Sequence, residues 1–135
     1  MGAIAPYLHN VREQAAKLLF HSTVSVNVMD MAKRMFLADL SLDASGGTAW
    51  ERGCLGLPSV LVVLAENQAA VAKALDARGA AIEIGNLSEI GEALPEVLST
   101  ISNSARLACM SKAAAQITDG LGTCRVANLM NELKW

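Results

Sequence analysis

The sequence is poor in charged residues, in aromatic residues and in clusters of basic residues. Charged residues make up 18% of the 135 positions and aromatic residues 4%, whereas hydrophobic residues make up 53%. A chain this apolar can bury a core, which excludes intrinsic disorder. The formal net charge is -2, and no basic cluster is longer than Lys33-Arg34. Because a duplex-binding surface needs several lysines or arginines on one face, we expect no nucleic-acid partner.

Long apolar runs, a leader pattern and paired cysteines are also lacking. The longest apolar run, residues 60–65, falls far short of the roughly 20 residues that cross a bilayer, and no basic start precedes an apolar segment as in a secretory signal. Cys54, Cys109 and Cys124 are odd in number and far apart, so they offer neither a disulfide framework nor metal-ligand spacing. We expect a cytoplasmic protein without a membrane span, a metal or a cofactor.

What the sequence does contain is an alternation of strand and helix patterns. Four segments are typical of strands, at residues 23–28, 39–44, 59–64 and 81–84. The first alternates β-branched and polar residues, and the third is continuously apolar, as in a sheet that is buried on both faces. Helical patterns separate and follow them, at residues 6–20, 30–38, 49–55, 68–78, from Pro95, from Asn103 or Ser104 to 117, and 123–133. The alternation predicts one α/β domain with a mostly parallel sheet.

The segment between the second predicted strand and its helix is a candidate binding loop. It consists of Ser45, Gly46, Gly47 and Thr48. Ligands of parallel α/β sheets bind beyond the carboxyl ends of the strands. Glycines there let the backbone approach a phosphate, and free N–H groups at the start of a helix point at the anion. The segment is neither a Walker loop nor a complete dinucleotide fingerprint, so a phosphate site and a simple tight turn stay equally open.

Three more polar residues lie where they could serve such a site. Glu51 lies about one turn into the helix, where a carboxylate can accept hydrogen bonds from ribose hydroxyls or merely interact with the helix dipole. Asn67 and Gln68 follow the third predicted strand. Their amides suit sugar hydroxyls and phosphates, or Asn67 is simply the N-cap of a helix and Gln68 a residue of its first turn. His9 and His21 have no visible partner, so the catalytic residues stay unknown.

Several motifs together carry a resemblance. They are Ala38-Asp39-Leu40, Gly46-Gly47-Thr48-Ala49-Trp50-Glu51-Arg52, Cys54-Leu55-Gly56-Leu57-Pro58, Glu66-Asn67-Gln68, Met110-Ser111, Asp119-Gly120-Leu121-Gly122 and Arg125-Val126. This series resembles the nucleotide-binding half of the UDP-sugar hydrolase of pseudaminic acid biosynthesis. A more distant likeness is to the C-terminal domain of the UDP-N-acetylglucosamine transferase of peptidoglycan synthesis, which has a two-domain glycosyltransferase-B (GT-B) fold. The resemblance covers nearly the whole chain.

The resemblance implies a Rossmann-like half of a GT-B fold that binds a UDP-sugar. Loop 45–48 would hold the pyrophosphate, Glu51 the ribose, and the two amides the distal phosphate or the sugar. Residues from Val28 to Met31 would border the uracil. In the family a histidine of a separate N-terminal domain assists the attack of water on the sugar–phosphate linkage. We therefore expect residues 1–135 to form one UDP-sugar-binding domain that is N-terminally truncated relative to the family and inactive alone.

Two other functions stay open: the donor-binding domain of a UDP-sugar glycosyltransferase, and a non-catalytic interaction module or gene remnant. In the resembling family the strand order of the sheet is 3-2-1-4-5-6, in which the first strands are central. Met1-Gly2 would align with the end of the family's second strand, so we expect central strands to be missing from this chain. We therefore expect strands 24–28 and 40–44 to repack beside each other, or an exposed strand edge to be covered by another chain, as in a homodimer.

The sequence also departs from the family within the binding loop. The family commonly has serines where this chain has Gly47 and Ala49, and a small residue where it has Asp43. We expect the loss of two hydroxyl donors and the added negative charge to weaken UDP binding, unless Asp43 points away from the phosphates. Like charges about 4 Å apart repel by roughly 4 kcal/mol at an effective dielectric near 20.

Overall fold

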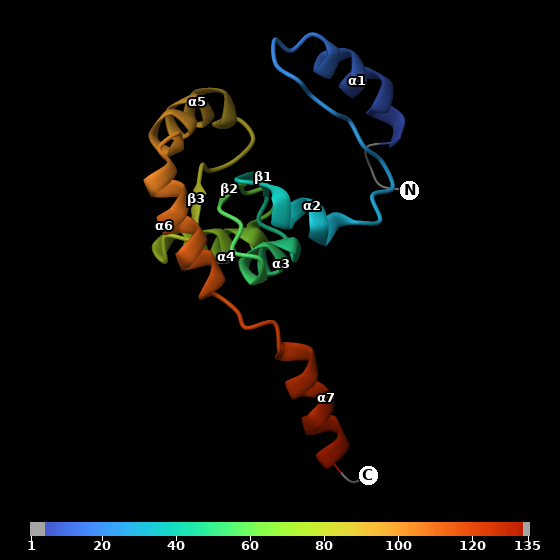
Figure 1. Cartoon of the computed structure of the whole chain (residues 1–135), viewed down its shortest axis with the longest axis vertical. Helices are drawn as coiled ribbons and strands as arrows, with labels where there is room; N and C mark the ends of the chain where they lie inside the picture. The colour runs from blue at the N-terminus through green and yellow to red at the C-terminus, as the bar shows by residue number, and fades with distance from the viewer. Residues whose placement is uncertain (1–4, 134–135) are drawn as a thin grey trace. The chain divides into compact units, whose positions relative to one another are not determined.

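The computed structural model describes residues 5–133, and Met1-Gly2 lies outside them. The chain divides into two compact units, Met1–Met31 and Ala32–Trp135, and each is described here by itself (Figure 1). In the first unit a short 3-10 helix, Ala5–Tyr7, leads into α1, Leu8–Ala16. The first helix is thus shorter than the 6–20 pattern predicts.

The second unit contains a parallel sheet of three strands in the order β1-β2-β3. The strands are β1, Ser41–Ala44; β2, Ser59–Val62; and β3, Ala81–Glu83. The register places Ser41 opposite Ser59 and Ser59 opposite Ala81. All four residues of the central strand β2 are buried, so its apolar run serves both faces of the sheet. The predicted α/β fold with a parallel sheet is confirmed.

The strand predicted at residues 23–28 is wrong. Residues 21–28 form no helix and no strand, although Val24, Val26 and Val28 alternate as in a strand. An extended segment becomes a strand only when a neighbouring strand takes up its N–H and C=O groups. Within the described part of the chain no strand does so, and β1 pairs with β2 alone. Because residues 24–28 form no strand, they do not supply the strand expected beside residues 40–44, and the homodimer stays a prediction.

Helices cover both faces of the sheet in the second unit (Figure 1). The helices from residue 31 onward are α2, Met31–Leu37; α3, Thr48–Cys54; α4, Glu66–Ala77; α5, Ile90–Ile101; α6, Ser104–Ala115; and α7, Gly122–Glu132. Of these, α2 and α7 have no buried residue. Side chains of α3 and α4 pack on one face and side chains of α5 on the other, and α6 contributes side chains to both clusters. Helix α6 contacts both α3 and α5, so it joins the two layers at one side of the sheet.

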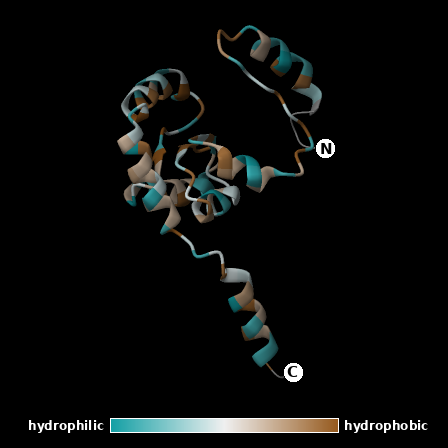
Figure 2. Cartoon of the chain, viewed as in Figure 1, coloured by the Kyte–Doolittle hydropathy of each residue, from teal (hydrophilic) through white to brown (hydrophobic). Residues whose placement is uncertain are grey.

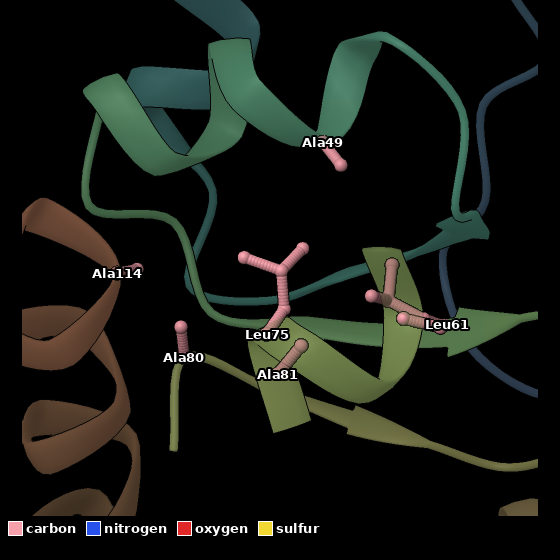
Figure 3. Packing of buried hydrophobic residues seen from close by; sticks show 7 residues of the cluster. Ala49, Leu61, Leu75, Ala80, Ala81 and Ala114 are labelled. Carbon is pink, nitrogen blue, oxygen red and sulfur yellow. The ribbon is translucent and has the colours of Figure 1, made fainter. Parts of the chain in front are cut away.

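The core consists of two clusters separated by the sheet. Figure 3 shows the first, in which Leu61 of β2 and Leu75 of α4 lie among alanines of α3, β3 and α6. Small side chains at these positions let the helices approach the sheet closely. The second cluster joins Val60 and Val62 to Ile101 of α5. Successive residues of β2 therefore point into opposite clusters, which fixes the register of the strand.

Two predicted helix boundaries are confirmed by their backbone chemistry. Gly56 has φ +64 directly after α3, a conformation that favours glycine. Asn103 is the N-cap of α6, and its side-chain oxygen accepts a hydrogen bond of 2.8 Å from the N–H of Ala105. Such capping stabilises the start of a helix by about 1 kcal/mol.

The helix expected to start at Pro95 instead begins at Ile90 and contains the proline. A proline inside a helix removes one backbone hydrogen bond and costs about 3 kcal/mol. The apolar side chains of α5 that face the second cluster outweigh this cost, at roughly 1.5–3 kcal/mol for each one fully buried. They are Ile90, Ala93, Leu94, Val97 and Ile101.

Helix α7 has no buried residue, and Figure 2 shows hydrophobic and hydrophilic residues along it. Among the helices of residues 5–133, none is long and apolar enough to cross a membrane.

The turn before α7 contains an ion pair between Asp119 and Arg125. The Asp119 Oδ1 atom also accepts a hydrogen bond of 3.0 Å from the N–H of Leu121. The hydrogen bond from Arg125 is the main reason that the pKa of Asp119 falls to about 2.

We expect this ion pair to be visible as a shifted titration. The Asp119 carboxylate should protonate near pH 2, and Arg125→Gln should return its pKa toward the ordinary value of 3.8. Because the pKa is lowered in the folded state, the pair stabilises the turn above pH 4, and this contribution is lost as the pH falls toward 2. NMR titration of the side-chain carboxyl carbons measures both values, and a wild-type midpoint near pH 4 would contradict the ion pair.

Candidate functional site

The candidate site begins at the carboxyl edge of the sheet, where the loop Ser45–Thr48 follows β1. The N–H of Ser45 donates a hydrogen bond of 3.3 Å to the carbonyl of Val62, so this loop leaves the sheet beside the end of β2. The N–H of Val63 in turn donates to the carbonyl of Gly85 at 2.8 Å. The segments that follow all three strands therefore emerge at one edge, which is the edge that binds ligands in parallel α/β sheets.

The loop presents unused backbone donors. The N–H groups of Ala49 and Trp50 donate to the carbonyls of Gly46 and Gly47, at 3.0 and 3.3 Å. The N–H groups of Gly46, Gly47 and Thr48 donate to no group within residues 5–133. Three consecutive free donors of this kind can bind the oxygens of an anion.

The glycines of the loop are required neither by backbone conformation nor by packing. Gly47 has φ -56, and neither Gly46 nor Gly47 is among the glycines with positive φ. A Cβ atom built on either residue would meet no atom within 4 Å. The space that a side chain would occupy is therefore open at both positions. A ligand that approaches the bare backbone would account for the two glycines.

Beneath the loop lies a buried arginine, Arg52 of α3, whose side chain is 1% exposed. Its Nη1 donates to the Oδ2 of Asp43 at 2.7 Å and to the Oγ1 of Thr48 at 3.0 Å. Its Nη2 donates to the carbonyl of Ala44 at 3.2 Å, and its Nε to the Oγ of Ser59 at 3.1 Å. Four of the five guanidinium N–H groups are thereby used, and they connect the end of β1, the start of α3 and the start of β2.

This network corrects the expectation about Asp43. The expected repulsion assumes a free negative charge near the phosphates, whereas the structure pairs this carboxylate with the Arg52 guanidinium. A paired carboxylate repels an anion far less than a free one, because the field of the guanidinium opposes it. Its second oxygen, Oδ1, accepts a hydrogen bond of 2.7 Å from the N–H of Ala44.

The expectation about Ala49 is also wrong. Ala49 is 3% exposed, and it belongs to the first core cluster with Leu61 (Figure 3). A serine hydroxyl at this position would face apolar side chains instead of the loop opening, so alanine removes no donor from the site.

Ser45 is 2% exposed, and its hydroxyl has no hydrogen-bond partner within the described residues.

The structure places the other predicted binding residues in two of the segments that leave this edge. Glu51 lies in the first turn of α3 and is exposed. Asn67 is exposed and lies inside α4, which begins at Glu66 with Ala65 as its N-cap, so the alternative of an Asn67 cap is wrong. The Oε1 of Gln68 accepts a hydrogen bond of 3.1 Å from the N–H of Leu64, which leaves its NH2 group for other partners.

Val28 and Met31, predicted to border the uracil, belong to the other compact unit, Met1–Met31. Their side chains are half-buried and exposed, respectively. They lie in a different unit from loop 45–48, and their role stays a prediction.

A groove elsewhere in the second unit contains none of the predicted site residues. It has a volume of about 450 Å³ and is lined by α2, by the segment before β2 and by α6. Asp39 and Pro58 line it, and they come just before β1 and β2. The groove therefore lies at the amino edge of the sheet, opposite the candidate loop.

Arg52 is the residue at the centre of this network to which sequence reasoning gave no role. It appears there only as part of the Trp50-Glu51-Arg52 motif. One signal was available: Arg52 follows Thr48 by four residues, and residues spaced this way are neighbours on a helix. The contacts with Asp43 and Ser59 could not be read from spacing, because they depend on how α3 packs against two strands.

The fold and the site together define a class of protein: a half of a GT-B fold, of the C-terminal-like kind. MurG of Acinetobacter baumannii matches with a TM-score of 0.83 and 27% sequence identity, over 96% of this chain and 39% of that one. The glycotransferase of kitacinnamycin matches with a TM-score of 0.54 and 19% identity, over 98% of this chain and 40% of that one, and this second likeness shows the fold alone.

Among curated proteins, the chain is similar to the spore coat polysaccharide biosynthesis protein SpsG of Bacillus subtilis (strain 168). The two are 30% identical over 139 aligned positions, which cover 98% of this chain and 40% of SpsG. The chain thus spans about two fifths of the length of the proteins that it matches. No protein-family model matches it.

Proposed function

We propose that this chain binds a nucleoside-diphosphate sugar, with UDP as the nucleotide, as the donor-binding domain of a glycosyltransferase-like enzyme of polysaccharide biosynthesis. The observation that carries the proposal is the row of free N–H groups at Gly46, Gly47 and Thr48, which opens onto space that no side chain fills. Each diphosphate oxygen can accept such hydrogen bonds, and charge-assisted hydrogen bonds are stronger than neutral ones.

The similar proteins support the sugar-polymer part of this proposal. SpsG is described as a polysaccharide biosynthesis protein, and the motif series resembles proteins that use UDP-sugars. Within the site, Glu51 is proposed to bind the ribose, and Asn67 and Gln68 to bind the distal phosphate or the sugar. Ser45 and Thr48 belong to the diphosphate loop, and Val28 and Met31 are proposed to border the uracil.

The hydrolase of pseudaminic acid biosynthesis shares the binding step and differs in the group that attacks the sugar. A hydrolase uses water, whereas a transferase uses a hydroxyl of an acceptor. None of the similar proteins is described as a hydrolase, so the glycosyltransferase interpretation has the better support. In either case the catalytic step belongs to a whole protein, and about 60% of the length of SpsG and of MurG lies outside the matched region.

Calorimetric titration with UDP tests the proposal. We expect measurable heat with UDP and weaker binding of UMP, which lacks one phosphate. Glu51→Ala and Asn67→Ala should each weaken UDP binding by roughly 1–3 kcal/mol, the usual cost of losing a buried hydrogen-bond partner in a complex. Glu92→Ala in α5 is the matched control for Glu51 and should change nothing. Absence of heat at millimolar UDP, with a folded protein by circular dichroism, would refute the proposal.

A further inference from the structure

The loop 45–48 lies above a pair of opposite charges that differ greatly in exposure. The guanidinium of Arg52 is 1% exposed, whereas the side chain of Asp43 is 49% exposed. A ligand at the loop therefore cannot contact the cation directly, but it can approach the carboxylate. Since solvent screens the exposed partner more than the buried one, the two charges are not equivalent for an approaching anion.

Arg52 is held in place by contacts that do not depend on Asp43. The carbonyl of Ala44, the hydroxyl of Thr48 and the hydroxyl of Ser59 accept three of its four hydrogen bonds. An asparagine at position 43 offers an oxygen where the Asp43 carboxylate accepts the fourth. The guanidinium can thus keep its position when the charge of Asp43 is removed.

Thr48 connects this pair to the open face of the loop. Its Oγ1 accepts a hydrogen bond from Arg52, so its own O–H proton is free to donate to another group. A hydroxyl that accepts from a guanidinium is polarised and is a stronger donor for that reason. Its backbone N–H is one of the three free donors of the loop.

The balance of charge along the segment is unfavourable for an anion. Between residues 43 and 52 the charged residues are Asp43, Glu51 and Arg52, which gives one positive and two negative charges, a net -1. Neutralising position 43 brings this segment to zero and leaves the positive charge of Arg52 without its counter-ion.

We propose that Asp43 sets the anion affinity of the loop: its carboxylate cancels the buried charge of Arg52, and removing that charge strengthens diphosphate binding. Arg52 is the positioning residue that fixes Thr48, and Asp43 is the residue that limits affinity. This inference rests on the proposed diphosphate site. It predicts a gain of binding from a substitution that removes an ion pair, which a purely structural role of the pair would not produce.

The test measures the dissociation constants of UDP and UMP for the wild-type chain, for Asp43→Asn and for Asp39→Asn. Asp39 is an exposed aspartate at the amino edge of β1, so its substitution makes the same change in net charge at the opposite end of the strand. We expect Asp43→Asn to bind UDP roughly threefold to tenfold more tightly at low salt. The gain should be smaller for UMP, and it should shrink as salt is raised. Asp39→Asn should bind as the wild type does.

Asp43→Ser supplies a second uncharged variant if Asp43→Asn does not fold, and circular dichroism verifies folding of each protein. Equal or weaker UDP binding by a folded, uncharged variant, beside a wild type that binds, overturns this inference and leaves the proposed function standing. Equal gains in Asp43→Asn and Asp39→Asn also overturn it, because the effect would then be one of total charge. Failure of every folded protein to bind UDP removes the proposed function and this inference together.

Discussion

Replacement of Arg52 by methionine is expected to lower the free energy of unfolding by about 3 kcal/mol, a large share of the 5–15 kcal/mol typical of a domain. Methionine fills much of the volume but donates no hydrogen bond. The half-buried carbonyl of Ala44 and the buried hydroxyl of Ser59 lose the donor that they share, although the Ser59 hydroxyl keeps its own hydrogen bond to the carbonyl of Leu57. Each buried acceptor left without a donor costs about 1–3 kcal/mol. The half-exposed Asp43 regains water and adds less.

Thermal unfolding followed by circular dichroism measures this effect. A loss of about 3 kcal/mol corresponds to a decrease in Tm of about 10 °C for a domain of this size. Arg106→Met is the matched control, because Arg106 is exposed on α6, and we expect its Tm to stay within about 2 °C of the wild type. A Tm of Arg52→Met equal to that of the control would show that the buried arginine does not hold β1, α3 and β2 together.

Replacement of Gly46 by leucine is expected to weaken UDP binding without lowering the stability of the protein. A Cβ atom at this position meets nothing within 4 Å, so the leucine side chain extends into the open space and strains no contact. Removing the backbone freedom of glycine from the unfolded chain can even stabilise the protein, by about 0.4–1 kcal/mol. The same side chain occupies the space proposed for the diphosphate, so we expect the Kd for UDP to rise at least tenfold.

The fluorescence of Trp50 can report this binding, because its side chain is 46% exposed and lies two residues after Thr48. Trp135→Phe in every protein removes the other tryptophan of the chain. Gly91→Leu is the control: Gly91 is exposed in α5, and a Cβ atom there also meets nothing within 4 Å. Unchanged UDP binding by a folded Gly46→Leu variant would exclude the loop as the diphosphate site.

Local patterns predicted those parts of the fold that local chemistry determines. Gly56 and Asn103 marked helix ends correctly, because a left-handed glycine and a capping amide act within a few residues. The continuous apolar run of β2 indicated a strand buried on both faces. The strand predicted at residues 23–28 is wrong because its formation does not depend on local chemistry alone. The segment has the pattern of a strand, but a strand also needs a partner, and the segment itself does not encode that pairing.

In the candidate site, too, local patterns predicted the position of the loop but not the side-chain contacts that depend on packing. The glycine pair after β1 and the order of strands placed the loop correctly at the carboxyl edge of the sheet. The sequence patterns did not reveal the contacts of Arg52, its pairing with Asp43 or the burial of Ala49. Each of these depends on which way a side chain points after α3 has packed on the sheet, toward the core for Ala49 and toward Arg52 for Asp43.

The most direct test of the account is a titration of the isotope-labelled chain with UDP, followed by the backbone amide resonances. If free N–H groups of the loop bind the diphosphate, the amides of Gly46, Gly47 and Thr48 should show the largest shifts, moving downfield as they donate to phosphate oxygens. Uridine, which has no phosphate, should leave these three resonances in place. Shifts confined to residues of the groove at the opposite edge of the sheet, with the three loop amides unmoved, would contradict the account.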